Sequence, residues 1–222
     1  MVAHDEGPSV PAAVHCALAA LGQLQQRSTP VEAWLMLHGA DRATQVAAHH
    51  LARSSDLPIR LLRRRRHGPA EAWMAGIRQT NVPWIALATV DDLLTAPWFT
   101  EVFAAIRSLS EARRCIYHPS RLFAFEVEQR MQCLPDQQEL QHPLAASLSQ
   151  ELWPGTCVAH RSVFQACPLL PEEHPLLLEG RPMPSGGDPV LWSWHSRCLQ
   201  QGFEHRVLEG TCQFRRLRAP RV

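Results

Sequence analysis

Two adjacent carboxylates, Asp91 and Asp92, follow an apolar run that spells ALATV from Ala86 to Val90. The run has the pattern of a buried strand. A carboxylate pair at the end of such a strand either caps the next helix, here one that begins near Pro97, or holds a charged ligand. A third aspartate, Asp188, stands directly before an apolar helical pattern and is well placed as its N-cap.

The first half of the chain contains the elements that must position the carboxylate pair. Apolar strand patterns recur about every 25 residues with helical patterns between them, which is βαβ spacing and predicts an open α/β sheet with right-handed crossovers. The strand patterns cover Ala33–Leu37, Ile59–Arg63 and Trp84–Thr89. Ligands of such sheets bind outside the carboxyl ends of the strands, so the position of the pair favours a binding site.

The second half has a less regular pattern. It predicts strands at 115–118, 122–127, 156–160 and 203–208, and a helix from 189 that ends before Gly202. Within that helix Trp192 and Trp194 point to different faces, so we expect one in the core and the other beside an acceptor groove. The Pro- and Gly-rich segment Cys167–Gly187 predicts a loop, which we expect to close over a bound donor.

Composition excludes several classes of function. A net charge of +1, from 22 basic and 21 acidic residues, gives no argument for binding nucleic acid or an acidic membrane surface. Seven cysteines without a CxxC pair predict reduced, mostly buried thiols in a cytoplasmic protein. No apolar window approaches the ~18 residues of a membrane span, and no basic region at the N-terminus indicates a signal peptide.

The order of these elements and motifs, over nearly the whole length of the chain, resembles that of family 2 glycosyltransferases, which have the GT-A fold. VAHDE (2–6) is similar to the family's Pro-x-Tyr-Asn-Glu start, and HGPAEAWMAG (67–76) to its glycine-rich helix start. TVDD (89–92) matches the last two positions of its Asp-x-Asp-Asp motif. GDPVLW (187–192), followed by QGFEHRVL and QFRR, matches the layout of its late motifs.

The resemblance implies a fold and an organisation. The fold is a GT-A-like open, mostly parallel sheet flanked by helices, with a less regular acceptor-side half. One domain would cover residues 1–222, with a nucleotide-sugar-binding half at 1–110 and an acceptor-side half at 111–222. It also implies that a metal-dependent, inverting enzyme transfers a sugar from a nucleotide sugar to a glycan, lipid or protein acceptor.

The resemblance also implies roles for single residues. Asp91 would bind a divalent metal, Mg or Mn, with the help of Asp92, and Asp188 would be the general base that deprotonates the acceptor. The nucleotide sugar would contact residues at the ends of the first, second and fourth family strands, namely His4, Asp5, Glu6, His38, Thr89 and Asp91. His4 would stack on the base in place of the family's tyrosine.

The sequence departs from the family at polar ligand positions. Leu37 and His38 replace an acidic pair that reads base and ribose, Thr89 replaces the first aspartate of its motif, and Gly187 replaces a glutamate. These replacements predict weak or altered nucleotide binding. They also keep a second function open, a non-catalytic binding module for nucleotide sugar or glycan. A nucleotidyltransferase ranks last, because the N-terminus has no glycine-rich phosphate loop.

Two further segments carry expectations. The run Arg63–Arg66 can clamp a diphosphate or can form a solvated strand end, and the second reading is favoured. In the family a full buried strand precedes the Pro-x-Tyr motif, whereas Met1 alone precedes Val2 here. We therefore expect Val2 and Ala3 to supply only a stub in the middle of the sheet, with flanking strands that lack part of a partner. We also expect either a start codon further upstream or a marginal protein that needs another segment to fill this slot.

Overall fold

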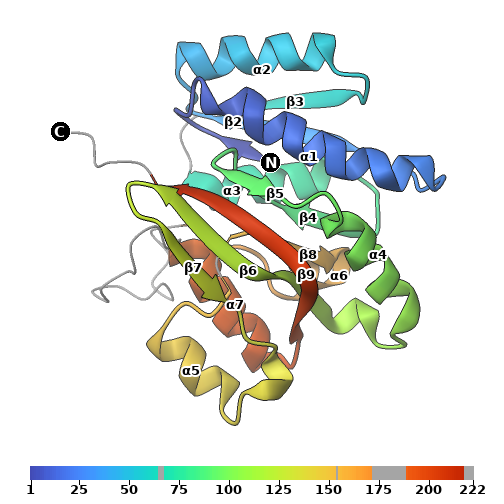
Figure 1. Cartoon of the computed structure of the whole chain (residues 1–222), viewed down its shortest axis with the longest axis vertical. Coiled ribbons are helices and arrows are strands. Elements are labelled where there is room, and N and C mark those ends of the chain that lie inside the picture. Colours follow the sequence, from blue (N-terminus) through green and yellow to red (C-terminus); the bar gives the residue numbers. More distant parts are fainter. Residues whose placement is uncertain (65–67, 154, 172–188, 218–222) are drawn as a thin grey trace.

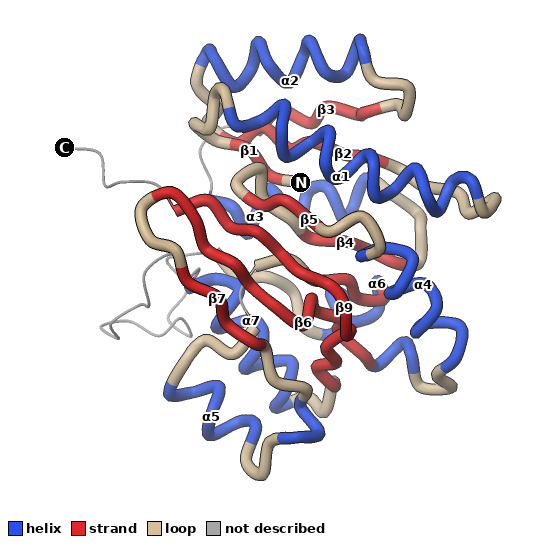
Figure 2. Tube along the Cα trace, in the orientation of Figure 1, coloured by secondary structure: helices blue, strands red, loops and turns tan. Residues whose placement is uncertain are grey.

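The computed structural model describes residues 1–64, 68–153, 155–171 and 189–217 (Figures 1 and 2). The helices are α1 (Ser9–Gln26), α2 (Arg42–Ser54), α3 (Gly68–Gln79), α4 (Trp98–Ser108), α5 (Pro143–Ser149), α6 (Arg161–Ala166) and α7 (Pro189–Gln200). The strands are β1 (Val2–Ala3), β2 (Ala33–His38), β3 (Ile59–Arg64), β4 (Trp84–Leu87), β5 (Asp92–Leu94), β6 (Cys115–Glu126), β7 (Arg130–Cys133), β8 (Cys157–His160) and β9 (Glu204–Leu217).

The first sheet is parallel, in the order β1-β2-β3, and confirms the predicted βαβ units. Its strands alternate between two covered faces. Leu35 and Leu37 pack with residues of α1 and α2, while Met36 packs on the other face with Trp73 and Ile77 of α3. Helices therefore cover both faces, which explains why β2 is a continuous apolar run.

The second sheet is mixed, in the order β4-β8-β6-β9-β5, with β7 paired to β6. β4 and β8 run antiparallel, whereas β6 and β9 run parallel over most of their length. The two strands predicted at 115–118 and 122–127 are one strand, β6. Its register shifts between Pro119 and Arg121, and such an irregularity accommodates a proline that cannot donate to the ladder.

β1 joins the two sheets. Val2 N–H donates to the Ala88 carbonyl at 3.1 Å, and Val90 N–H donates to the Val2 carbonyl at 3.2 Å. The strands therefore follow the order β3-β2-β1-β4, with β1 in the middle as a stub of two residues, as expected. β2 and β3 extend the sheet on one side of β1 and β4 on the other. This is a switch in strand order, and ligands of open α/β sheets bind at the carboxyl ends beside such a switch.

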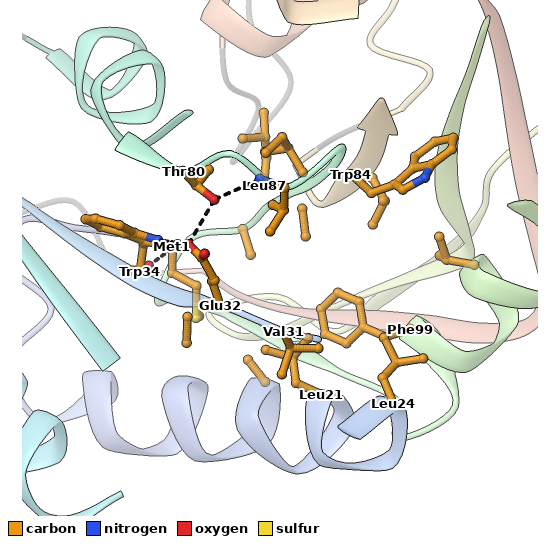
Figure 3. A pocket seen from close by; sticks show the side chains of 18 of the residues that line it. Met1, Leu21, Leu24, Val31, Glu32, Trp34, Thr80, Trp84, Leu87 and Phe99 are labelled. Atoms are coloured by element: carbon orange, nitrogen blue, oxygen red, sulfur yellow. Dashed lines mark hydrogen bonds between the residues drawn. The ribbon is translucent and has the colours of Figure 1, made fainter. Parts of the chain in front are cut away.

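A cavity of about 690 Å³ lies where a longer β1 would continue, between β2 and β4. Its wall is mainly apolar, and Figure 3 shows Phe99 and Leu24 at one end and Glu32 hydrogen-bonded to Trp34 and Thr80 at the other. The Met1 amine donates to the Trp34 carbonyl at 2.8 Å, and burial lowers its pKa to about 5.

Two local predictions concern helices. Asp41 caps α2, because its carboxylate accepts from Thr44 N–H at 2.7 Å, as predicted. The expectation that one tryptophan of α7 lines a groove is wrong, because Trp192 and Trp194 are 2% and 0% exposed. Their indoles donate to the carbonyls of Ser147 and Cys167, which anchors α7 in the core. Across the described ranges, no helix is both long and apolar enough to cross a bilayer.

Candidate functional site at the carboxyl ends of β1, β2 and β4

The residues of the N-terminal half that the sequence predicts to bind the nucleotide sugar share one edge of the sheet. His4 follows β1, His38 ends β2, and Thr89 and Asp91 follow β4. β1 and β2 are parallel neighbours, and Val2 bridges to Thr89 in parallel, so the carboxyl ends of all three strands meet. The structure therefore brings these residues to the switch in strand order.

His4 and His38 form a stacked pair at this edge. Their ring centroids lie 4.7 Å apart with planes 19° apart, and His4 Nδ1 lies 2.7 Å from the His38 carbonyl oxygen. Glu6 folds back so that its carboxylate accepts from His4 N–H at 2.5 Å, and Asp5 is half-buried in the same turn. The pair presents aromatic surface where the resemblance places a base-stacking tyrosine.

Asp92 is buried and its carboxylate is fully engaged. Gln213 Nε2 and Arg215 Nε donate to Oδ1 at 2.7 and 3.2 Å. The hydroxyls of Thr89 and Thr156 donate to Oδ2 at 2.9 and 3.4 Å. The side chain is 0% exposed, and its partner Arg215 is 11% exposed. This carboxylate ties the turn after β4 to β8 and β9.

Asp91 differs from its neighbour in its surroundings. The residue is half-buried, and its main-chain carbonyl accepts from Arg216 N–H at 3.0 Å. Asp92 begins β5, which pairs with β9, and α4 starts at Trp98 without a side-chain cap. The alternative in which the pair caps this helix is therefore wrong.

The sequence does not predict the partners of Asp92. Gln213 and Arg215 lie in β9, within the stretch QFRR, which by itself only resembles a late motif of the family. Gly155 also belongs to this cluster: it has φ +70°, and a Cβ on it would overlap the Arg215 guanidinium. A glycine with positive φ opposite a buried arginine is visible only once the two segments are placed together.

The remaining predicted residues of this region lie as follows. Leu37 is buried in the sheet at 2% exposure, so it presents no side chain at the edge. Arg63 and Arg64 end β3 and are exposed, and Arg63 donates to the Gln45 side chain. The rest of that arginine run, the proposed base Asp188 and most of the predicted loop Cys167–Gly187 lie outside the described residues.

Comparisons with known proteins identify the fold. A family model described as glycosyl transferase family 2 matches residues 1–121. No curated protein matches the sequence.

Three solved structures are similar in fold. TarS 1–349 of S. aureus, in complex with UDP-GlcNAc, has a TM-score of 0.64 at 10% identity, over 99% of this chain and 59% of that one. GalNAc-T7 with UDP, GalNAc and Mn²⁺ has a TM-score of 0.60 at 14% identity, over 98% and 43%. The mannosyltransferase PcManGT of Pyrobaculum calidifontis, with GDP-Man and Mn²⁺, has a TM-score of 0.54 at 15% identity, over 96% and 54%.

The chain thus spans about half the length of these structures, and at such low identity they show the fold alone. That fold is GT-A, with a parallel sheet flanked by helices, as the sequence predicted. Because the matching family model covers more than half of the sequence, the chain belongs to glycosyl transferase family 2.

Proposed function

We propose that the chain is a glycosyltransferase domain that moves a sugar from a nucleotide-sugar donor to a glycan, lipid or protein acceptor. The observation that carries the proposal is the convergence of His4, His38, Thr89 and Asp91 at the switch in strand order of a family 2 fold. The imidazole rings at this edge can stack on the base of a nucleotide-sugar donor, and a carboxylate here can hold a metal ion for its diphosphate. We place the donor with the half at 1–110 and the acceptor with the half at 111–222.

A divalent metal is compatible with the side chains at this edge. Mg²⁺ and Mn²⁺ prefer oxygen ligands, and such ions are often held by one or two protein carboxylates together with substrate phosphates. Five donors among the described residues already occupy the Asp92 carboxylate. Asp91 would therefore hold the metal with the diphosphate, while Asp92 fixes the turn that carries Asp91. The bound metal would offset the charge that develops on the leaving diphosphate.

The proposed transfer is a single displacement. The acceptor hydroxyl oxygen bonds to the anomeric carbon as that carbon's bond to the diphosphate oxygen breaks, which inverts the configuration. The hydroxyl must lose its proton during the attack, and a carboxylate near it can accept that proton. We assign this role to Asp188, which precedes Pro189, the first residue of α7.

Donor recognition would use the stacked histidines. The nucleotide base would stack on His4, and Asp5 and Glu6 would accept hydrogen bonds from ribose or base. Leu37 is buried and the His38 ring already stacks on His4, so the two positions offer no acidic pair to a base. Each missing hydrogen bond to a charged group removes ~1.5–3 kcal/mol, which supports weak binding or altered base selectivity.

A second candidate is a binding module without turnover. Thr89 supports it, because its hydroxyl donates to Asp92 instead of supplying a metal ligand. In this reading the fold retains a donor or glycan and catalyses nothing.

Calorimetry and a transfer assay together test both candidates. Binding of UDP- or GDP-sugars would be measured with and without Mn²⁺ for the wild type, Asp91→Asn and Asp188→Asn, with the exposed Asp56→Asn as the matched control. The transferase predicts metal-dependent donor binding that is lost in Asp91→Asn, and turnover that is lost in Asp188→Asn with binding intact. Donor binding without turnover on any acceptor tested, or glycan binding alone, would support the module. A chain that binds neither donor nor glycan would refute both.

A further inference from the structure

Three histidines from distant parts of the chain meet in the core, away from the edge described above. His118 lies in β6, His195 in α7 and His205 in β9, and they are 0%, 2% and 0% exposed. β6 and β9 pair in parallel with His205 opposite Ile116, so His118 and His205 lie two register positions apart on neighbouring strands. α7 adds the third ring.

His195 places buried nitrogens without a hydrogen-bond partner in the described part of the cluster. His118 Nε2 and His205 Nδ1 lie 2.9 Å apart and share one hydrogen bond. Both nitrogens of His195 make none, whereas the backbones of Thr156 and His195 lie close to the rings of His118 and His205. Buried polar atoms normally have partners, so the two nitrogens of His195 point to a ligand for the cluster.

The separations of the rings match what a metal requires. With zinc–nitrogen bonds of about 2.0–2.1 Å and tetrahedral angles, the ring centroids of three imidazoles lie roughly 5 Å apart. The three centroid distances are 5.0, 5.1 and 5.0 Å, and one nitrogen from each ring can be chosen within 4.8 Å of the others.

The surroundings suit a neutral three-histidine site. Trp153 stacks on His205 with centroids 4.0 Å apart and planes 7° apart, and so covers one side of the cluster. Burial lowers the pKa of His195 to about 3 and the pKa values of His118 and His205 well below their usual range. Burial thus favours the neutral form of the rings, which is the form that binds metals.

We propose that His118, His195 and His205 form a second metal site, for a zinc-type divalent ion with water as the fourth ligand. Imidazole nitrogens prefer Zn²⁺ to the hard ions Mg²⁺ and Mn²⁺, which prefer oxygen, so this site is chemically distinct from the donor edge. The ion would clamp α7 to β6 and β9. It would thereby fix the helix that follows the proposed base, Asp188. This consequence rests on the proposed function, whereas the metal site itself does not.

Metal content and a Co²⁺ spectrum test the site on the full chain without nucleotide. The wild type, His195→Gln, Asp91→Asn and the surface control His49→Gln/His50→Gln would each be purified from zinc-supplemented medium. We expect roughly one zinc per chain in all except His195→Gln. We also expect visible d–d bands of tetrahedral Co²⁺ after exchange. Because only the folded state forms this site, removal of the metal should lower Tm by roughly 5 °C or more, and Zn²⁺ should restore it.

The outcomes separate the metal site from the donor site. Zinc retained in Asp91→Asn but lost in His195→Gln assigns the ion to the core cluster, whether or not the chain transfers sugar. A wild type that holds no zinc, shows no tetrahedral Co²⁺ bands and has an unchanged Tm with Zn²⁺ overturns the proposal. That result would make the cluster a metal-free core of stacked rings. If His195→Gln does not fold, the wild-type metal content and Co²⁺ spectrum decide alone.

Discussion

Replacement of Asp92 by Asn tests whether this carboxylate is structural. The change keeps the shape of the side chain and removes the charge that pairs with the Arg215 guanidinium, which is 11% exposed. Asn can still accept from Gln213, so part of the hydrogen bonding at Oδ1 survives. We therefore expect a large loss of stability that arises mainly from the loss of this buried ion pair.

The size of the loss follows from the burial of the pair. Removing one partner of a buried ion pair typically destabilises by ~3–5 kcal/mol. The surviving hydrogen bonds place the expected value near the lower end, ~3 kcal/mol. At about 2–4 °C per kcal/mol for a chain of this size, Tm should fall by about 6–12 °C. A domain has only ~5–15 kcal/mol of stability, so the variant remains folded but marginal.

Urea unfolding followed by tryptophan fluorescence measures this loss as a shift in midpoint at constant m. Asp91→Asn is the matched control, because it removes the neighbouring charge outside the buried network. The double variant Asp92→Asn/Arg215→Met should lose less stability than the sum of the two single variants, since it removes both charges of the ion pair together. A loss below ~1 kcal/mol in Asp92→Asn, or additive losses in the double variant, would refute the structural role.

Four further outcomes are expected. Asp91→Asn should keep its unfolding free energy within ~0.5 kcal/mol of wild type while losing Mn²⁺-dependent donor binding in calorimetry; retained binding would exclude it as a ligand. Gly155→Ala should lower the urea midpoint, by ~2 kcal/mol or more, because φ is +70° and its Cβ would displace Arg215. Gly76→Ala should be neutral or stabilising by ~0.5 kcal/mol, because alanine favours the helix. Its Cβ would meet the Met36 thioether, which lines the cavity of about 690 Å³ and has room to move into it. Clear destabilisation would show that the cavity wall is rigid. Base selectivity should be weak, so UDP and GDP should bind with similar affinity in calorimetry, and tight uracil-selective binding would contradict the account of the replaced acidic pair.

Short-range patterns predicted much of the fold. The apolar run at Ala33–Leu37 became β2, because a strand covered on both faces requires apolar side chains in succession. The strand predicted at Ile59–Arg63 became the edge strand β3. Asp41 was identified as a cap because capping depends on residues only three positions apart. The edge of the sheet that holds His4 and Asp91 also followed, since parallel strands end together.

Long-range partners could not be predicted in the same way. Nothing near Asp92 in the sequence indicates that Arg215 neutralises it, because the contact depends on the antiparallel pairing of β5 with β9. His118, His195 and His205 show no ligand spacing along the chain and meet only through the parallel pairing of β6 and β9 and the packing of α7. Likewise the patterns at 115–118 and 122–127 predicted two strands, whereas a register shift after Pro119 lets one strand continue.

The network around Asp92 has a consequence for how the protein is made. Its partners Thr156, Gln213 and Arg215 follow it by 64, 121 and 123 residues. Synthesis runs from the N-terminus, so the residues of the first sheet leave the ribosome well before these partners do. Until then the Asp92 carboxylate stays hydrated and β5 has no strand to pair with. The turn that carries Asp91 can therefore become ordered only after Arg215 has been synthesised, later than the residues of the first sheet become available.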